Sequence, residues 1–386
     1  LYAALLGTLP PLVLMQLYVE AGARYFVAQA SHHDHFFNYG SKLNRFNSVQ
    51  VGPHKDICAL WKQAAKHYGL PFGLTEHLGA SFSWWKTNKG CDAYGPYKGI
   101  PYDGNDPAYR DFYHDNAEHV DGNNDSIDPW YTGNIRFQAY WLSAVREMLD
   151  LFQPELLYTD GGLPFGMREE PGRTGSDVSD ERYRTGLEML SYYYNSSIKW
   201  NGSNQAVYLQ KDVRPEISRI GILDVEKSQL SEGSERPWHT DTCIGNWFYD
   251  AKQTYKKCDQ IIEMLVDIVS KNGNMLLNVL QKPDGTIDEE ARFLLKELAA
   301  WNRICGEGIY DTRPWKVFGE GKTRVDTEGF TERKTSWEEG DYRFTKKGDC
   351  VYAFVMKAPQ DRTCVIRSFS REPVRKIELL GAGEVE

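Results

Sequence analysis

The chain has 386 residues and a formal net charge of −9 at pH 7. An acidic surface repels nucleic acid and anionic lipid, so neither is expected as a partner. No apolar run reaches the roughly 18 residues of a membrane span. The seven cysteines are scattered without a C-x-x-C pair, which predicts neither a disulfide framework nor a zinc knuckle.

Strand and helix patterns alternate through most of the chain. Short apolar runs typical of buried strands each follow an amphipathic helix pattern. This alternation predicts a parallel α/β fold. The predicted strands are residues 24–30, 71–76, 156–160, 206–210 and 274–280, and the helices before them are 14–21, 55–68, 134–151, 181–196 and 255–270.

Two segments depart from this alternation. Residues 86–134 form a long loop rich in Gly, Asn, Asp and Tyr, and such length is typical of a functional insertion or lid. Residues 219–225 resemble a strand but begin only nine residues after Gln210. That gap is too short for a helical crossover, so one of the two runs is expected to be a hairpin or a loop excursion.

From about Lys316 the pattern changes to short alternating runs at 341–344, 350–357 and 363–368, with turn residues between them. These runs predict a small antiparallel domain. The length leaves room for one barrel of about 250 residues and such a second domain. We therefore expect a catalytic domain over residues 1–315 and a β-sandwich-like domain, cut off before its last strands, over 316–386.

Residues 155–163, Glu-Leu-Leu-Tyr-Thr-Asp-Gly-Gly-Leu, are the most informative stretch. A buried strand that ends in an acid and two glycines delivers one carboxylate to the mouth of a β/α barrel, where such folds keep their active sites. Asp160 is therefore the first candidate for a catalytic residue. The alternative is an Asp that only caps the following turn.

Histidines follow the first predicted strand, in Ser31-His-His-Asp-His-Phe. Alternation would place His33 and His35 on one side and His32 and Asp34 on the other. Donors to sugar hydroxyls are favoured over solvated loop residues and over metal ligands, because adjacent imidazoles do not easily reach one ion. No metal is therefore expected.

Other polar and aromatic residues follow the same pattern. Glu76 and His77 end the next strand and would share its rim with Asp160. The Trp pair in residues 81–85 is a weak sign of a stacking wall. Residues 237–249, Pro-Trp-His-Thr-Asp-Thr-Cys-Ile-Gly-Asn-Trp-Phe-Tyr, favour a pocket wall over a merely structural loop.

Taken in order, these motifs resemble glycoside hydrolase family 29, the retaining α-L-fucosidases. The resemblance runs from about Met15 to about Trp315 and includes the C-terminal β segment. The stretches that carry it are residues 21–36, 46–56, 69–85, 156–166, 224–249, 264–290 and 306–315.

The resemblance implies a (β/α) barrel of TIM type followed by a small antiparallel β domain. It implies hydrolysis of terminal α-L-fucose from a glycan or oligosaccharide by double displacement through a fucosyl-enzyme, without metal or cofactor. Asp160 would be the nucleophile, and His32 and His33 would bind fucose hydroxyls. The further substrate contacts would be Glu76, His77, Tyr158 and Trp238.

The second carboxyl group is less well defined. A retaining glycosidase needs two carboxyl groups about 5–5.5 Å apart. Glu226 in Asp-Val-Glu-Lys is the first candidate for the acid/base, and Glu216 is the second. If residues 219–225 form a strand, Glu226 lies at its far end and Glu216 lies before its start.

One departure from the family pattern bears on activity. The family begins with a strand that carries His-Trp-Gly, and nothing before Met15 matches it. We therefore expect the barrel to lack its first βα unit, with residues 1–14 foreign to the fold. The alternatives are a catalytically impaired fucose-binding barrel and a metal-dependent hydrolase that uses residues 32–35.

The resemblance also predicts that the intact protein is secreted, periplasmic or lysosomal. Residues 1–14 are apolar but lack the basic start of a signal peptide. The sequence carries no signal for the fucosyl linkage, the aglycone or the oligomeric state.

Overall fold

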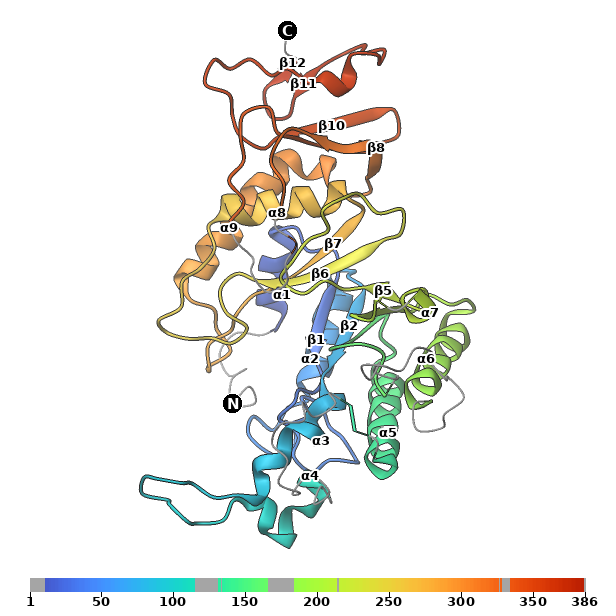
Figure 1. Cartoon of the computed structure of the whole chain (residues 1–386), viewed down its shortest axis with the longest axis vertical. Helices are drawn as coiled ribbons and strands as arrows, with labels where there is room; N and C mark the ends of the chain where they lie inside the picture. The colour runs from blue at the N-terminus through green and yellow to red at the C-terminus, as the bar shows by residue number, and fades with distance from the viewer. Residues whose placement is uncertain are drawn as a thin grey trace, which may run out of the picture. The chain divides into compact units, whose positions relative to one another are not determined.

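The computed structural model describes residues 11–114, 131–132, 134–165, 184–213, 215–325, 327 and 334–384. They fall into two compact units (Figure 1). Residues 25–221 belong to the first unit, and residues 11–24 join residues 222–384 in the second. The expected domain boundary after residue 315 stays a prediction. No helix in the described ranges is long and apolar enough to cross a membrane.

Parallel strands form the core of the first unit. In chain order, β1, β2, β3 and β4 lie side by side and run in one direction. Leu74 pairs with Leu157 in the register, and both side chains are buried. The residues that follow each strand therefore meet at one edge of the sheet. The strands, all predicted, are β1 (Phe26–Gln29), β2 (Phe72–Glu76), β3 (Leu156–Thr159) and β4 (Val207–Gln210).

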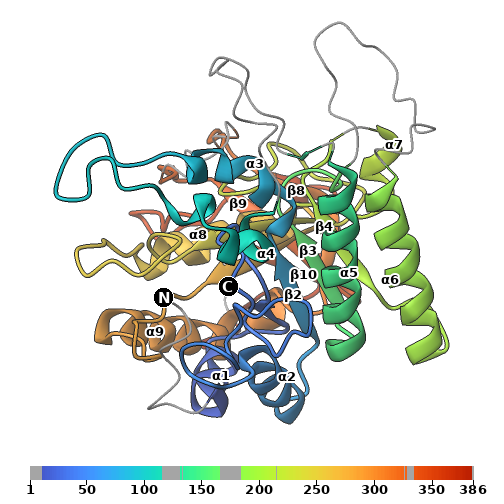
Figure 2. The ribbon, with the colours of Figure 1, turned by 90° about the horizontal axis from the view of Figure 1, so that it is seen from below.

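The helices of this unit begin at the expected signals. The Asp56 side chain caps α2 (Ile57–His67) by accepting from the Ala59 amide. The Asn134 side chain caps α5 (Ile135–Phe152) by accepting from the amides of Arg136 and Phe137. α5 and α6 (Thr185–Asn201) lie side by side in both views (Figures 1 and 2). The predicted helices at 55–68 and 134–151 are confirmed.

The described part of the long segment after β2 contains a series of short helical turns and two isolated β-bridges. The helical turns are η2 (Leu78–Ala80), α3 (Ser81–Trp84), η3 (Trp85–Lys89), η4 (Asp103–Asn105), η5 (Pro107–Tyr109) and α4 (Arg110–Tyr113). Part of the expected lid, residues 115–130 and 133, lies outside the described residues. The role as a lid stays a prediction.

The second unit contains a parallel pair, β6 (Trp238–Cys243) and β7 (Gly273–Asn278), joined through α8 (Cys258–Ser270). β7 and α8 were predicted, whereas the segment that forms β6 was predicted only as a pocket wall and not as a strand. The N-terminal helix α1 (Pro11–Glu20) packs against α9 (Glu289–Cys305). The Asn302 side chain donates to the Ala21 carbonyl just after α1, at 2.6 Å. Residues 1–10 lie outside the described residues.

The run at residues 219–225 contains one short strand, and the expected hairpin or loop excursion stays a prediction. A single helical turn, α7 (Pro215–Ser218), precedes a two-residue strand, β5 (Ile222–Leu223). Asp224 then pairs with His239 of β6 in parallel. The parallel strands of the described chain belong to two separate sheets, and no closed barrel is formed among them.

An antiparallel sheet follows, as predicted. Its strands are β8 (Arg313–Glu320), β9 (Tyr342–Lys347) and β10 (Cys350–Val355), in the order β10-β9-β8. The expected strand at 363–368 is wrong, because that segment ends in the helical turn η9 (Arg367–Phe369). A two-stranded ladder pairs β11 (Glu378–Leu379) with β12 (Gly383–Glu384).

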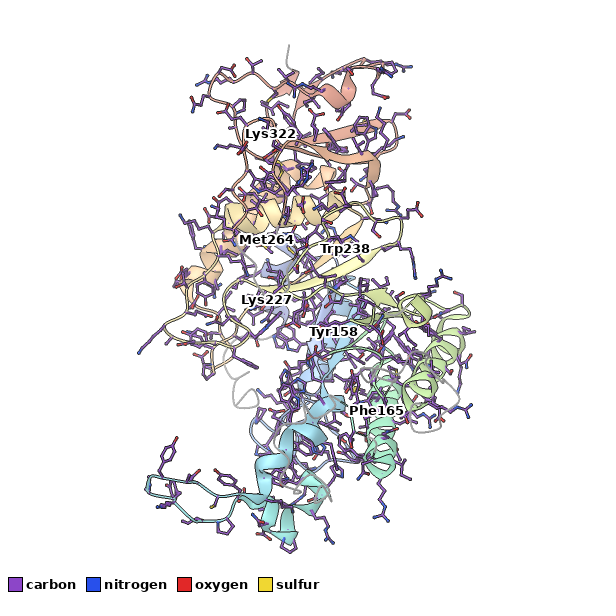
Figure 3. All side chains as sticks on the ribbon, in the orientation of Figure 1. Tyr158, Phe165, Lys227, Trp238, Met264 and Lys322 are labelled. Atoms are coloured by element: carbon purple, nitrogen blue, oxygen red, sulfur yellow. The ribbon has the colours of Figure 1, made fainter. Side chains whose placement is uncertain are left out.

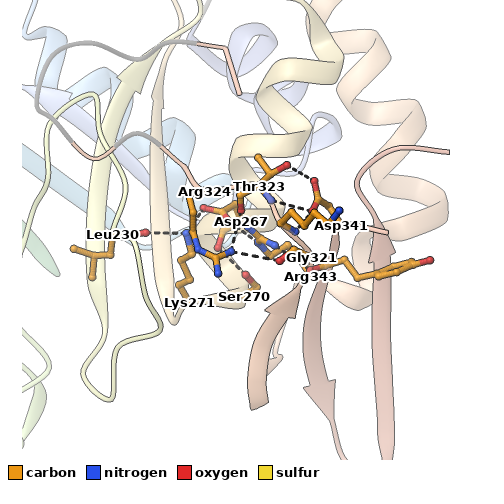
Figure 4. A network of polar contacts seen from close by, with 11 residues as sticks. Leu230, Asp267, Ser270, Lys271, Gly321, Thr323, Arg324, Asp341 and Arg343 are labelled. Atoms are coloured by element: carbon orange, nitrogen blue, oxygen red, sulfur yellow. Dashed lines mark hydrogen bonds and ion pairs between the residues drawn. The ribbon is translucent and has the colours of Figure 1, made fainter. Parts of the chain in front are cut away.

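Buried charges join α8 to β9 in this unit (Figure 4). The Asp267 carboxylate accepts from Arg343 Nε at 2.5 Å on one oxygen and from Lys271 Nζ at 2.7 Å on the other. Lys271 also donates to the Leu230 carbonyl at 2.8 Å. The three charged side chains are at most 5% exposed, so one anion offsets part of the charge of two cations away from water.

Candidate active site

Asp160 directly follows β3, where the chain leaves the sheet. Gly161 has φ of 81°, a left-handed conformation that favours glycine, and its amide donates to Asp160 Oδ1 at 3.0 Å. The Tyr131 hydroxyl bonds the carbonyls of Asp160 and Gly162, each at 2.8 Å. These contacts hold the turn in one conformation and leave the carboxylate 16% exposed.

Three histidines surround this carboxylate. His32 and His33 come from the segment after β1, and His77 directly follows β2. His33 Nε2 lies 3.5 Å from Asp160 Oδ2, and His77 Nδ1 lies 3.4 Å from the same oxygen. The rings of His32 and His77 stack with centroids 4.6 Å apart, and Trp84 lies 4.1 Å from the ring of His33. The structure therefore brings together Asp160 and all three predicted histidines.

Lys211 completes the cluster, and sequence reasoning missed it. It directly follows β4, and its Nζ donates to Asp160 Oδ1 at 2.7 Å. The same Nζ lies 5.5 Å from the ring centroid of Tyr158, a buried residue of β3 that Figure 3 labels. Its place just after a parallel strand, like that of Asp160, is the signal that could have identified it.

The surroundings hold Asp160 in its ionised form. Burial alone would raise the pKa of this carboxyl, but contacts with His33 and His77 and the charges of His77 and Lys211 together hold its pKa well below the usual range. The imidazole contacts are longer than ordinary hydrogen bonds. We therefore regard Lys211, at 2.7 Å, as the most direct of these partners.

His32 is held in its neutral form. Burial, followed by the charges of His77 and His33, lowers its pKa to about 3, although the charge of Asp160 opposes this shift. A neutral imidazole has one donor and one acceptor nitrogen, which suits a sugar hydroxyl that also donates and accepts. The expected role in hydroxyl binding stays a prediction.

Glu76 lies below this surface rather than on it. Its side chain is buried, and its Oε2 accepts from the Leu78 amide at 3.1 Å and from Trp141 Nε1 at 3.0 Å. Burial raises the pKa of this carboxyl to about 7, and the charge of Asp160 adds to the shift. Glu76 thus fixes the turn after β2, and its predicted contact with substrate stays untested.

The alternation expected for residues 32–35 is wrong, because this segment turns. The His35 amide donates to the His32 carbonyl at 3.0 Å, and His35 has φ of 57°. His35 is buried, with Nε2 2.6 Å from the Tyr140 hydroxyl and Nδ1 2.9 Å from the Phe112 carbonyl. It therefore supports the loop and does not join His33.

The second unit holds the predicted acid/base. Backbone bonds from Val225 N to His239 O and from Lys227 N to Asp241 O, both 2.9 Å, continue the parallel pairing beyond β5. The two bonds flank Glu226, which lies in a turn and has a half-buried side chain. His239 Nδ1 and Asp224 Oδ1 are 2.5 Å apart and buried.

Burial lowers the pKa of His239 to about 4, against the opposing charge of Asp241. The side chain of the other acid/base candidate, Glu216, lies outside the described residues.

Trp238 occupies β6 in the same unit (Figure 3). Its side chain is buried, and Nε1 donates to the Lys271 carbonyl at 3.0 Å. A Cβ added at Gly273 would lie 2.6 Å from the indole ring, so the ring packs directly on the partner strand. This packing does not favour a sugar contact, which stays a prediction.

An ionised carboxylate, partly open and lined by imidazoles at the carboxyl edge of a parallel sheet, is typical of an α/β enzyme that works by nucleophilic or acid–base chemistry. A family profile described as Alpha-L-fucosidase matches residues 10–307. The chain belongs to the alpha-L-fucosidase family.

Individual relatives are distant but cover nearly all of the chain. Tissue alpha-L-fucosidase of Rattus norvegicus is 25% identical over 95% of this chain and 66% of its own length. Alpha-L-fucosidase of Branchiostoma floridae is 22% identical over 96% of this chain and 69% of its own. The chain thus spans about two thirds of the length of these relatives.

Solved structures show the same fold. Alpha-fucosidase of Thermotoga maritima in complex with fucose is 24% identical, with a TM-score of 0.63 over 93% of this chain and 67% of that one. Alpha-L-fucosidase isoenzyme 1 of Paenibacillus thiaminolyticus is 21% identical, with a TM-score of 0.69 over 99% of this chain and 79% of that one.

Proposed function

We propose that this chain is a retaining exo-glycosidase that hydrolyses terminal α-L-fucose from glycans. The observation that carries the proposal is Asp160, which is kept ionised and partly open beside Lys211 and the histidines. A buried carboxylate with no chemical task is usually satisfied on both oxygens, whereas Oδ2 of Asp160 has only the two long imidazole contacts in its cluster. Membership in the alpha-L-fucosidase family supports the choice of sugar.

In this mechanism, Asp160 attacks the anomeric carbon of fucose and displaces the aglycone. The bond from Asp160 to the sugar forms as the glycosidic bond breaks, and water later releases fucose with the original configuration. His32, His33 and His77 would donate to and accept from the sugar hydroxyls. Lys211 holds the other oxygen of Asp160 and thereby directs Oδ2 toward the reacting carbon.

Glu226 is proposed as the acid/base that protonates the leaving oxygen and then deprotonates water. Its support is the family resemblance of residues 224–249 and its place in the turn that follows the parallel pairing of Asp224 with His239. Glu216 remains the second candidate. The acceptor side of the substrate, a fucosylated glycan or oligosaccharide, and the compartment of the protein stay predictions.

We further propose that the fold is a (β/α) barrel of TIM type with a C-terminal antiparallel domain. Three observations support it: the parallel strands β1–β4 and β6–β7, the helices between them, and the gathering of polar residues after β1, β2, β3 and β4. Likeness to the solved fucosidases points the same way.

Release of fucose from an aryl α-L-fucoside tests the proposed activity directly. We expect turnover, with α-L-fucose as the first-formed anomer by NMR, and no turnover of the aryl β-L-fucoside. Binding of fucose without turnover would instead favour a catalytically impaired fucose-binding protein. If the chain neither binds fucose nor hydrolyses the aryl fucoside, both proposals are contradicted.

Azide rescue tests the second carboxyl group. Glu226→Ala should lose activity on substrates with poor leaving groups, yet keep the first step on activated aryl fucosides, which need little protonation. Azide should then restore turnover by attacking the fucosyl-enzyme without a base. Glu235→Ala serves as a control from the same segment. Rescue of Glu216→Ala instead would move the role to Glu216.

A further inference from the structure

The imidazoles around Asp160 have the spacing of metal ligands. His32, His33 and His77 each offer a ring nitrogen, and the three nitrogens lie within 4.8 Å of one another. Neighbouring histidines reach one point because residues 32–35 form a turn, closed by the bond from the His35 amide to the His32 carbonyl. The extended geometry that would have separated the two side chains is absent from this segment.

Asp160 supplies the geometry of a fourth ligand. In a tetrahedral zinc site with bonds of about 2.0–2.2 Å, adjacent ligand atoms lie about 3.3–3.6 Å apart. Asp160 Oδ2 is 3.5 Å from His33 Nε2 and 3.4 Å from His77 Nδ1. These separations are long for hydrogen bonds but fit the edges of such a tetrahedron.

The environment supports the same occupant. The Nδ1 of His77 is buried and makes no ordinary hydrogen bond, so it has unused ligand capacity. Imidazole nitrogens select zinc and other late transition metals over Mg²⁺.

Charge sets the strength of such a site. Lys211 and the amide of Gly161 hold Asp160 Oδ1, which leaves Oδ2 for a second cation. The positive charge of Lys211, 2.7 Å from that carboxylate, repels a divalent ion. The site therefore suits reversible capture rather than a permanent cofactor.

We propose that His32, His33, His77 and Asp160 bind one Zn²⁺, and that bound Zn²⁺ excludes the sugar. The ion would occupy the carboxylate oxygen that attacks fucose and the nitrogens that bind its hydroxyls. Zinc is then a competitive inhibitor of the enzyme. The inhibitory part rests on the proposed function, whereas the metal site rests on geometry alone.

Calorimetric titration of chelator-treated full chain with Zn²⁺ tests the site without any sugar. We expect one Zn²⁺ per chain and no binding of Mg²⁺ at the same concentration. His77→Gln and Asp160→Asn should each raise the Kd for Zn²⁺ at least about tenfold. The control His67→Gln, an exposed residue at the end of α2, should leave the Kd unchanged.

Thermal unfolding of each variant separates loss of a ligand from loss of the fold. If His77→Gln does not fold, the test rests on Asp160→Asn, which keeps the size of the side chain. Anomalous diffraction at the zinc edge should place the ion among the four side chains. No binding at millimolar Zn²⁺, equal binding by every variant, or an ion located elsewhere would overturn the proposal.

Competition separates this inference from the proposed function. L-Fucose should weaken Zn²⁺ binding, and Zn²⁺ should raise KM for an aryl fucoside without changing kcat. If Zn²⁺ binding depends on the four residues but the protein hydrolyses no fucoside, the metal site is supported and the proposed enzymatic function is contradicted. If the protein hydrolyses the fucoside but does not bind Zn²⁺, the proposed function is supported and the metal site is contradicted.

Discussion

Among the described residues, Asp160 in the first unit and Asp267 in the second are both largely shielded from solvent beside cationic side chains, and they differ in how completely their oxygens are hydrogen-bonded. Asp267 has no exposed surface, and each of its oxygens accepts a short bond from a separate cation. Asp160 is 16% exposed and gives only Oδ1 to such a bond. Its Oδ2 has the two imidazoles at 3.4 and 3.5 Å.

Under the proposed function, this difference separates a structural carboxylate, Asp267, from a reactive one, Asp160. In a closed ion cluster every charged group is already paired, so no oxygen is available to solvent or ligand. Removal of one charged side chain leaves its buried partners without a counter-charge. A carboxylate with one fixed and one weakly engaged oxygen is oriented, ionised and still able to attack. Burial and the presence of cations do not distinguish the two sites, whereas the number of satisfied oxygens does.

The largest expected effect is loss of catalysis without loss of fold. Asp160→Asn should lower kcat for an aryl α-L-fucoside by on the order of 10³-fold or more, because the amide is not a nucleophile. The midpoint of thermal unfolding should change little. Asp150→Asn, an exposed change on α5, is the control. Near-normal turnover by Asp160→Asn would contradict the role of Asp160 as the nucleophile.

The reverse result is expected at the closed cluster. Asp267→Asn should lower the free energy of unfolding by about 3–5 kcal/mol, because it leaves Lys271 and Arg343 buried without their shared anion. Asp259→Asn on the same helix breaks an exposed ion pair with Lys334, keeps an oxygen that can accept from the Gln260 amide, and should cost less than about 1 kcal/mol. Chemical denaturation measures both. Equal effects would contradict the distinction.

Removal of the lysine should sharpen the account of Asp160. Asp160 must be ionised to attack, and activity is lost as pH falls through its pKa. Lys211→Met removes a cation that lowers this pKa, so the acidic limb of kcat/KM should move to higher pH by about 1–3 units. Lys199→Met, on the exposed end of α6, should leave the limb in place. An unmoved limb in Lys211→Met would assign the low pKa to the histidines.

The smallest effect concerns Glu76. The pKa of this carboxyl is about 7 in the fold, against about 4.3 in an unfolded chain. The folded state therefore binds more protons between these values, and the free energy of unfolding falls as pH rises through them. The amide oxygen of Glu76→Gln can still accept from Trp141, and the substitution should remove the part of the decrease in the free energy of unfolding that comes from this carboxyl group. An unchanged pH dependence of unfolding would contradict the assigned protonation.

Sequence reasoning identified candidate site residues where a single polar residue directly follows a predicted strand. Asp160 and His77 were identified because parallel strands bring their carboxyl ends to one edge. Lys211 obeys the same rule, but a lysine after an apolar run is common and was passed over. His35 was misplaced because its positive φ turns the segment.

The second unit was harder to predict, for a physical reason. All six residues of β6 are buried, and most are polar, so neither alternation nor an apolar run marks the strand. The pairing of Asp224 with His239 depends on the register between two segments, which composition does not encode. The difference between Asp160 and Asp267 depends in part on cations far away in sequence, Lys211 for Asp160 and Arg343 for Asp267.

Trapping the covalent intermediate tests the central claim most directly. An activated α-L-fucoside with fluorine at C2 slows hydrolysis of the fucosyl-enzyme, so mass spectrometry of a digest can locate the labelled residue. We expect one label per chain on the peptide that carries Asp160, and none in Asp160→Asn. A label on Glu226, on Glu76 or on any other residue would contradict the assignment of Asp160 as the nucleophile.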